Sequence, residues 1–176
     1  MEKTLVVFKP DAVKRGIIGE IITRFERTGL RIVGLKMVYP DKEHYHKHYE
    51  EIGTMITRHG KDIFNAQVDF MMTGPVVALV LEGVEAVDLV RKMAGQTEPK
   101  SSHPGTIRGD YAHISYGFAN SKGATVPNVV HASGNKKEAQ QEILHWFSDF
   151  ELFNYEMVHD VFTKANYRPK KAIKKS

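Results

Sequence analysis

The stretch Asn128-Val129-Val130-His131-Ala132-Ser133 runs directly into Gly134-Asn135-Lys136-Lys137-Glu138, which joins a short strand to the start of a helix. Adjacent valines favour a strand. Asn135 and Glu138, three residues apart, are typical of a helix N-cap and its capping partner. The pattern therefore predicts that His131 lies at the end of a strand and faces the N-terminus of a helix. A helix N-terminus stabilises anions. A nucleophilic imidazole there favours phosphoryl chemistry, although a lone histidine at a strand end is more often structural.

Strands and helices alternate outward from this stretch. Apolar spacing predicts strands at residues 4–9, 31–38, 76–81 and 129–131. Helices are predicted at residues 18–28, 43–52, 62–71, 84–93 and 136–147, with Gly29 and Gly95 placed to end two of them. Periodicity alone supports an α+β or α/β sandwich, and the element order is compatible with a ferredoxin-like sheet carrying helices on one face.

Two further segments carry basic residues beside glycine or proline. Lys9 follows the first strand in Lys9-Pro10-Asp11, and Arg108 stands between two glycines in residues 104–110. Arg91 lies on the helix predicted at residues 84–93. Guanidinium groups suit phosphate oxygens because they donate as a fork. Taken singly, each residue has a plainer interpretation: a solvated strand end for Lys9, a surface charge for Arg91 and a structural salt bridge for Arg108.

Taken together and in order, the motifs KPDAVKRG (9–16), PGTIRGD (104–110) and NVVHAS (128–133) resemble the nucleoside diphosphate kinase family. The resemblance covers residues 2–147 with two interruptions. It implies an α+β fold with a ferredoxin-like βαββαβ antiparallel sheet and helices packed on it. It also implies transfer of the terminal phosphoryl group of a nucleoside triphosphate to a nucleoside diphosphate, by a ping-pong mechanism through a phosphohistidine.

The resemblance assigns roles residue by residue. His131 is the nucleophile, Glu142 orients its ring, and Tyr49 lies near the phosphates. The residues that hold the phosphates and ribose are Lys9, Arg91, Thr97, Arg108 and Asn128. Magnesium is expected to arrive on the nucleotide phosphates, so no dedicated protein metal site is predicted. Family members are homo-oligomers, hexamers or tetramers, which implies the same here.

The chain departs from the family pattern in the base pocket. The aromatic on which the base stacks aligns with Ile63, which remains the expected base-binding position, and adjacent Phe64 is a candidate replacement ring. Gln67 stands where the family usually has an aliphatic residue. Losing the ring would remove about 1–3 kcal/mol of stacking. Two insertions fall within residues 51–61 and 111–127; the second is interpreted as a small hairpin that either walls the pocket, alters subunit contacts or is a tolerated surface loop.

Composition fits a cytoplasmic enzyme. The chain has 176 residues, 41% of them hydrophobic, and no cysteine, which excludes disulfides, zinc–thiolate sites and thiol catalysis. Neither a signal peptide nor a membrane span is predicted.

We expect a kinase-like domain at 1–162 and a basic tail at 163–176. Removing the tail's six basic residues from the 25 in the chain leaves 19 against 21 acids. The tail is interpreted as a solvated, mobile terminus rather than a nucleic-acid contact.

Two alternatives remain at this stage. His44, His46 and His48 alternate and invite a metal site, but no third ligand follows from their spacing, so a solvent-facing helix is preferred. The competing function is a catalytically weakened, kinase-like nucleotide-binding or regulatory protein with an anion-binding tail.

Overall fold

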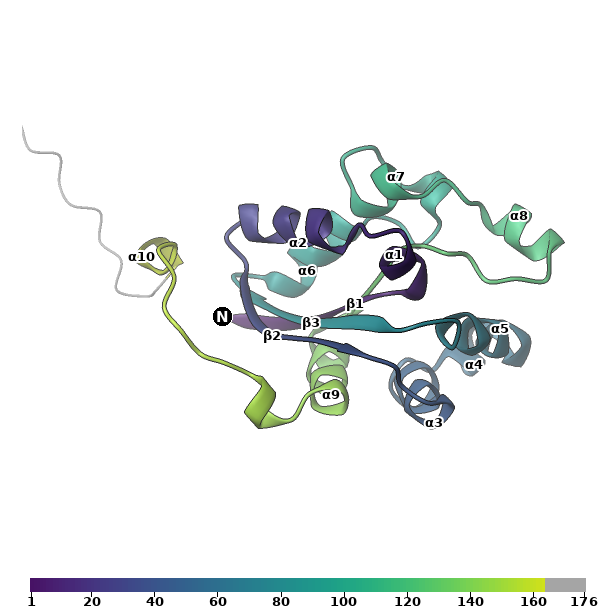
Figure 1. Cartoon of the computed structure of the whole chain (residues 1–176), viewed down its shortest axis with the longest axis horizontal. Helices are drawn as coiled ribbons and strands as arrows, with labels where there is room; N and C mark the ends of the chain where they lie inside the picture. The colour runs from purple at the N-terminus through teal and green to yellow at the C-terminus, as the bar shows by residue number, and fades with distance from the viewer. Residues whose placement is uncertain (164–176) are drawn as a thin grey trace, which may run out of the picture.

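β1 (Glu2–Phe8) lies inside a four-stranded sheet in the computed structural model, which describes residues 1–163 (Figure 1). Its neighbours are β3 (Val76–Gly83) and β4 (Val130–Ala132), and β2 (Arg31–Val38) pairs with the other side of β3. All three pairings are antiparallel. The order β2-β3-β1-β4, with helical crossovers, is that of the βαββαβ ferredoxin-like sheet. The predicted fold class is therefore confirmed.

One face of the sheet is covered by α2 (Ile18–Arg27) and α6 (Ala86–Ala94), together with α1 (Pro10–Lys14) and α7 (Ile107–Tyr111). Val6 and Phe8 of β1 point into this layer and are fully buried. Gly29 and Gly95 adopt φ values of +82° and +83°, which suit glycine at a helix end. They end the helices where the sequence predicts.

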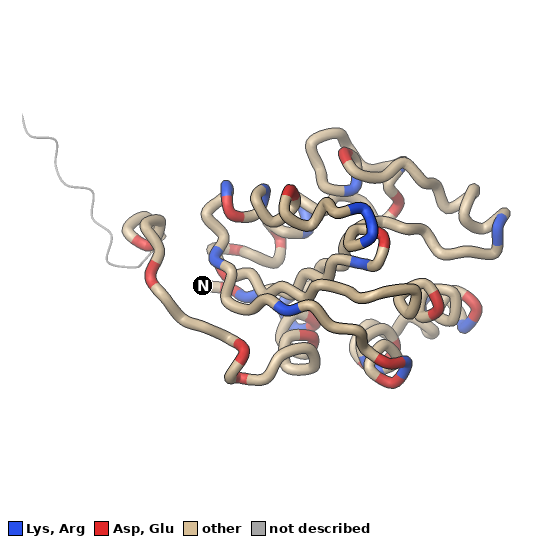
Figure 2. Tube along the Cα trace, in the orientation of Figure 1, with Lys and Arg blue, Asp and Glu red and all other residues tan. Residues whose placement is uncertain are grey.

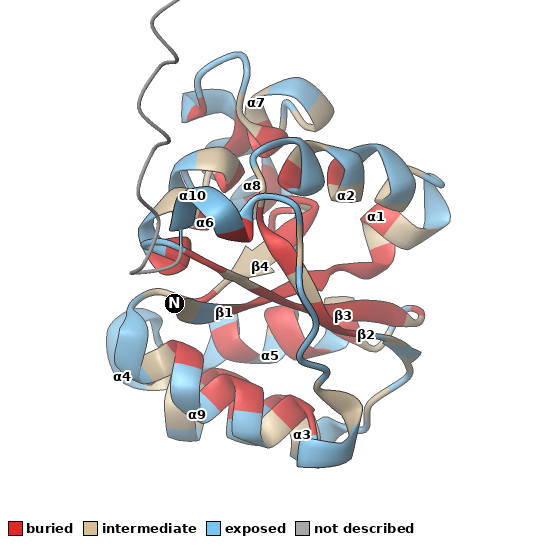
Figure 3. Ribbon diagram, turned by 90° about the vertical axis from the view of Figure 1, so that its left-hand side faces the viewer, coloured by how far each residue is buried: buried red, intermediate tan, exposed pale blue. Residues whose placement is uncertain are grey.

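The opposite face carries a second helical layer. It contains α3 (Lys42–His46), the π-helix η1 (Lys47–Ile52), α4 (Met55–His59), α5 (Lys61–Met71) and α9 (Lys136–Trp146). Leu5 and Val7 of β1 pack here, against Phe64 and Trp146 among others. The expectation of helices on one face is therefore wrong. The physical reason is that β1 and β3 are apolar on both faces, so both must be covered, as the buried strands of Figure 3 show.

The inserted segment 111–127 is not a hairpin, so that prediction is wrong as well. It completes α7 and forms α8 (Tyr116–Ser121). The Oγ atom of Ser115 accepts from the backbone N–H of Phe118 at 3.1 Å, which caps α8. A serine N-cap satisfies a backbone donor that would otherwise be free at the start of the helix, and this favours a helix over a strand pair.

The chain ends its described course along β2. The Phe153 N–H donates to the Val33 carbonyl at 2.7 Å, and Arg31 pairs with Asp160 at 2.8 Å between buried side chains. Three short helices complete the architecture: η2 (Pro99–Ser101), η3 (Asp149–Glu151) and α10 (Asp160–Thr163). Acidic and basic residues are interspersed along the trace (Figure 2). Within residues 1–163, no helix is long and apolar enough to cross a membrane. The basic residues of the predicted tail lie outside the described residues.

Candidate active site

A cleft of about 840 Å³ opens between the two helical layers and the end of the sheet at β4. All nine residues that the sequence assigns to a site line it, namely Lys9, Tyr49, Ile63, Arg91, Thr97, Arg108, Asn128, His131 and Glu142. They are spread over 133 positions of the chain, from Lys9 to Glu142, so the folded sheet brings them together. The cleft is large enough for a nucleotide-sized ligand.

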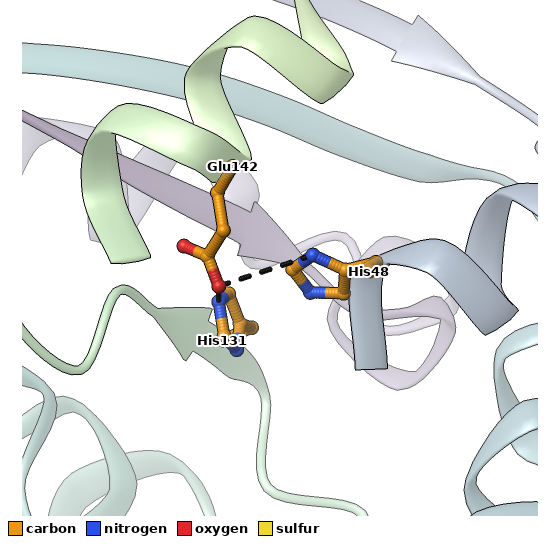
Figure 4. A group of neighbouring side chains, drawn as sticks. All are labelled: His48, His131 and Glu142. Atoms are coloured by element: carbon orange, nitrogen blue, oxygen red, sulfur yellow. Dashed lines mark hydrogen bonds and ion pairs between the residues drawn. The ribbon is translucent and has the colours of Figure 1, made fainter. Parts of the chain in front are cut away.

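The centre of the candidate site is the pair His131 and Glu142, which both line the cleft and whose side chains point toward one another (Figure 4). The Nε2 atom of His131 lies 2.8 Å from Oε1 of Glu142, and the Ser133 hydroxyl donates to Oε2 at 2.6 Å. Burial alone would raise the pKa of Glu142, but the neighbouring His131 and His48 rings and the Ser133 hydroxyl lower it to about 2. An ionised carboxylate accepts a hydrogen bond from the Nε2–H group. The Nδ1 atom of His131 then keeps its lone pair and can act as a nucleophile.

His48 is a third member of this centre that the sequence interpretation missed. It is buried, its ring lies 4.6 Å from the His131 ring at 80°, and Trp146 Nε1 donates to its Nδ1 at 3.1 Å. Burial and the adjacent imidazoles hold its pKa well below the ordinary value. The solvent-facing helix expected for the three alternating histidines is therefore wrong for His48. The available signal was its position beside Tyr45 and Tyr49, whose rings are both buried.

Within the described residues, His48, His131 and Glu142 are the group whose spacing matches metal ligands. Several of their polar atoms already have hydrogen-bond partners, since Nδ1 of His48 accepts from Trp146 and the two Glu142 oxygens pair with His131 and Ser133. A magnesium ion prefers oxygen ligands in octahedral geometry, which this imidazole-rich group does not offer.

Tyr49 stands beside the histidine on the π-helix η1, and π-helical turns are frequent at functional sites. Its ring lies 6.4 Å from the His131 ring at 89°. Its hydroxyl oxygen accepts from Gln67 Nε2 at 3.0 Å. Burial raises the pKa of Tyr49, so the hydroxyl keeps its proton.

Basic side chains line the same cleft as His131. Lys9 Nζ donates to Oδ1 of Asn128 at 2.6 Å, and the Asn128 amide donates to the Thr97 carbonyl at 2.8 Å. Burial, with the charge of Arg108, lowers the pKa of Lys9 to about 7. Exposed Arg91 lines the same wall. An anion entering here would meet cationic groups removed from water, where charge interactions are strong.

Arg108 differs from the loop residue that the sequence suggested. It lies on α7, is buried, and donates to the carbonyl oxygens of Gly95, Asn128 and Val130 at 2.8, 3.2 and 2.7 Å. Burial lowers its pKa to about 10, so it remains cationic near neutral pH. Between Asn128 and Val130, Val129 adopts φ +71°, a strained value for a β-branched residue. Arg108 therefore clamps the strained turn that leads into His131.

The outer end of the cleft has an altered lining. Ile63 is 49% exposed there, whereas Phe64 is 7% exposed and packs in the core beneath the sheet. The suggested replacement of the missing ring by Phe64 is therefore wrong, because the helix directs adjacent side chains to different faces. Tyr116 and Thr125 of the inserted segment line the cleft, so this segment walls the pocket.

The family model described as nucleoside diphosphate kinase matches residues 2–152. The chain belongs to the nucleoside diphosphate kinase family. The kinase of Pyrococcus furiosus is 48% identical over 174 residues, which cover 99% of this chain and 98% of the relative.

Solved structures agree with the sequence match. The Borrelia burgdorferi nucleoside diphosphate kinase, described as a transition-state mimic with bound vanadate and ADP, superposes with a TM-score of 0.89 at 42% identity, covering 92% of this chain and 96% of that chain. The Halobacterium salinarum kinase in complex with CDP gives 0.78 at 37% identity, with coverage of 92% and 97%. The family, fold and phosphotransferase activity predicted from the sequence are confirmed, and the weakened-kinase alternative is not favoured.

Proposed function

We propose that the kinase works by a ping-pong mechanism through phosphorylated His131. The observation that carries this proposal is the pairing of Nε2 with Glu142, since among the described residues Nδ1 then has no hydrogen-bond partner. In the first half-reaction the Nδ1 lone pair forms a bond to the γ-phosphorus of the triphosphate. The bond from that phosphorus to the β–γ bridging oxygen breaks, and its electron pair leaves with the diphosphate. A second diphosphate attacks the phosphohistidine in the reverse sense.

Glu142 serves this cycle as a positioning residue. It fixes the tautomer of His131, and its negative charge stabilises the imidazolium character that develops as Nδ1 bonds to phosphorus. Ser133 supports the carboxylate through Oε2, and the Ser133 hydroxyl is itself tied to the Leu5 N–H at 3.1 Å. This chain of hydrogen bonds fixes the position of His131 relative to β1.

The remaining cleft residues would hold the nucleotide. Lys9, Arg91 and Arg108 supply positive charge for the phosphates, Tyr49 supplies a hydroxyl, and Thr97 and Asn128 supply polar contacts to phosphate and ribose. Magnesium would enter on the nucleotide phosphates as part of the substrate and neutralise their charge. Ile63 would contact the base. The Borrelia burgdorferi relative, described as a transition-state mimic with bound vanadate and ADP, supports a nucleotide and phosphoryl site in this fold.

A homo-oligomer, hexamer or tetramer, is part of the proposal. On the edge strand β2, Leu35 and Met37 are 51% and 59% exposed, and Tyr39, just after the strand, is 58% exposed. All three follow Val33, whose carbonyl accepts from the Phe153 N–H. Exposed apolar side chains on an edge strand favour contact with another chain. We further propose that residues 1–162 are the kinase domain, with 163–176 as an appended basic tail. The cytoplasmic location stays a prediction.

Intact-mass measurement tests the mechanism. Incubation with magnesium and ATP should add one phosphoryl group, which GDP should then remove, and His131→Ala should add none while still binding ADP. Retention of the added group after GDP, or its appearance in His131→Ala, would contradict the ping-pong mechanism at this residue.

A further inference from the structure

A chain of hydrogen bonds connects the inserted segment to the tyrosine of the active site. The Thr125 hydroxyl donates to Gln67 Oε1 at 2.9 Å, and Gln67 Nε2 donates to the Tyr49 hydroxyl oxygen at 3.0 Å. Gln67 is 4% exposed and Tyr49 is 7% exposed, so water has little access to either. The three residues come from the segment 111–127, from α5 and from η1.

The direction of these bonds decides where the phenolic proton lies. An amide accepts through its oxygen and donates through its nitrogen, and Thr125 holds the oxygen, so the nitrogen faces Tyr49. Because the phenolic oxygen accepts from Gln67, its own proton must point elsewhere. Within residues 1–163 the Tyr49 hydroxyl donates to no protein group, and its residue lines the cleft beside His131.

We propose that Gln67 is a positioning residue for phosphoryl transfer, held by Thr125 so that it aims the Tyr49 hydroxyl proton into the cleft at the transferred phosphoryl group. This inference rests on the proposed function, in which Tyr49 contacts the phosphates. It also gives the inserted segment a role in the chemistry, because Thr125 belongs to that segment.

Packing alone does not require an amide at this position. An aliphatic side chain, as the family usually has, fills a buried helix face without needing partners. A buried amide left without hydrogen bonds costs roughly 1–3 kcal/mol. Here both ends of the Gln67 amide are satisfied by hydroxyl groups, one from the insertion and one from the active site.

The decisive variant is Gln67→Glu, with Gln140→Glu on the exposed face of α9 as the matched control. A protonated carboxyl group can donate to Tyr49 and accept from Thr125, as the amide does. Once ionised, the carboxylate can only accept hydrogen bonds, so the Tyr49 hydroxyl donates to it and no longer into the cleft. The ordinary pKa of about 4.3 should be raised by burial.

The measurement is the single-turnover rate of phosphorylation by magnesium-ATP between pH 5 and 9. The ratio of the Gln67→Glu rate to the wild-type rate should fall about ten-fold or more as the introduced carboxyl group ionises, because the directed hydrogen bond is lost. Tyr45, His48, His131 and Glu142 lie around Tyr49 in the wild type and in both variants, so the ratio removes the pH dependence that these proteins share. The ratio for Gln140→Glu should stay flat.

A second pair of variants tests the other end of the chain. Thr125→Val should slow phosphorylation roughly three- to ten-fold with an unchanged Kd for ADP, and Thr125→Ser, which keeps the hydroxyl, should restore the rate. This pair decides the matter if Gln67→Glu melts at a much lower temperature than the wild type.

A flat ratio for Gln67→Glu, or equal rates for Thr125→Val and Thr125→Ser, would overturn the role of Gln67 while leaving the phosphohistidine mechanism intact. Failure of the wild-type protein to accept a phosphoryl group would instead reject the proposed function itself. The two failures are therefore distinguishable in one experiment.

Discussion

The Arg108 guanidinium donates from Nη2 to the carbonyl oxygen of Val130, 2.7 Å away, and so fixes the residue that immediately precedes His131. Its other two bonds hold the carbonyl groups of Gly95 and Asn128. A residue expected to contact phosphate is thus also a clamp on the strained turn at Val129. The Arg108 side chain both supplies positive charge to the cleft and holds the backbone before His131, so replacing Arg108 would disturb both.

Glu142 should make the stability of the fold depend on acid pH. Its pKa is lowered from 4.5 to about 2, so its stabilisation is complete above the unfolded-state value and is lost as pH falls toward 2. The shift is worth about 3 kcal/mol at neutral pH and about 1 kcal/mol at pH 3. In urea unfolding, the difference in unfolding free energy between the wild type and Glu142→Gln should shrink by about 2 kcal/mol from pH 7 to pH 3. A difference independent of pH would argue against an ionised Glu142 in the folded protein.

Nucleotide binding should take up a proton through Lys9. Burial lowers its pKa to about 7 in the free protein, and contact with phosphates should raise it again. Affinity for ADP should therefore fall as pH rises above 7, where the free protein has lost the proton that the complex needs. Calorimetry in buffers of different ionisation enthalpy measures the uptake. Lys9→Met should abolish it, and an undiminished uptake in that variant would assign the proton to another group.

The base pocket should respond to a restored ring. Ile63→Phe places an aromatic group at the exposed end of the cleft and should lower the Kd for ADP about five-fold, equivalent to about 1 kcal/mol of stacking. Phe64→Leu is the matched control, since Phe64 packs in the core and should leave the Kd unchanged. Fluorescence titration with a labelled ADP distinguishes these outcomes. Weaker binding by Phe64→Leu would mean that its ring reaches the base after all.

The exposed part of β2 should govern assembly. Sedimentation velocity of the wild type should give a multiple of the single-chain mass, and Met37→Glu should shift the population toward smaller species, because a charge would be buried in an apolar contact. Leu144→Glu, on the exposed side of α9, is a control of the same kind. Equal sedimentation of wild type and Met37→Glu would place any subunit contact elsewhere.

The basic tail should be separable from catalysis. Deleting residues 164–176 removes all six basic residues of that region and should leave kcat and KM unchanged. Any salt-dependent binding of nucleic acid by the full chain should disappear with the deletion, since phosphate contacts release counterions. Gel-shift titrations at two salt concentrations make the comparison. A large fall in kcat would show that the kinase domain extends beyond residue 162.

Local sequence preferences were enough to place most strands and helices and the functional residues at their ends. The apolar spacing of residues 31–38, the Asn135 cap and Gly29 act through local preference, so β2, α2 and α9 were placed within one or two residues. The three ordered motifs indicated the family and the residues around His131, because a match of that length can be recognised from the sequence alone.

Which side chains meet depends on how the chain packs in three dimensions. Nothing in the spacing of His48, Gln67 and Thr125 places them around one active site, since each contact joins segments that are remote in sequence. The second helical layer, the inward turn of Phe64 and the helix in the insertion likewise follow from burial and capping in three dimensions. Local preference fixes where a strand or helix forms, whereas packing fixes which of its faces is buried and which partners its polar groups find.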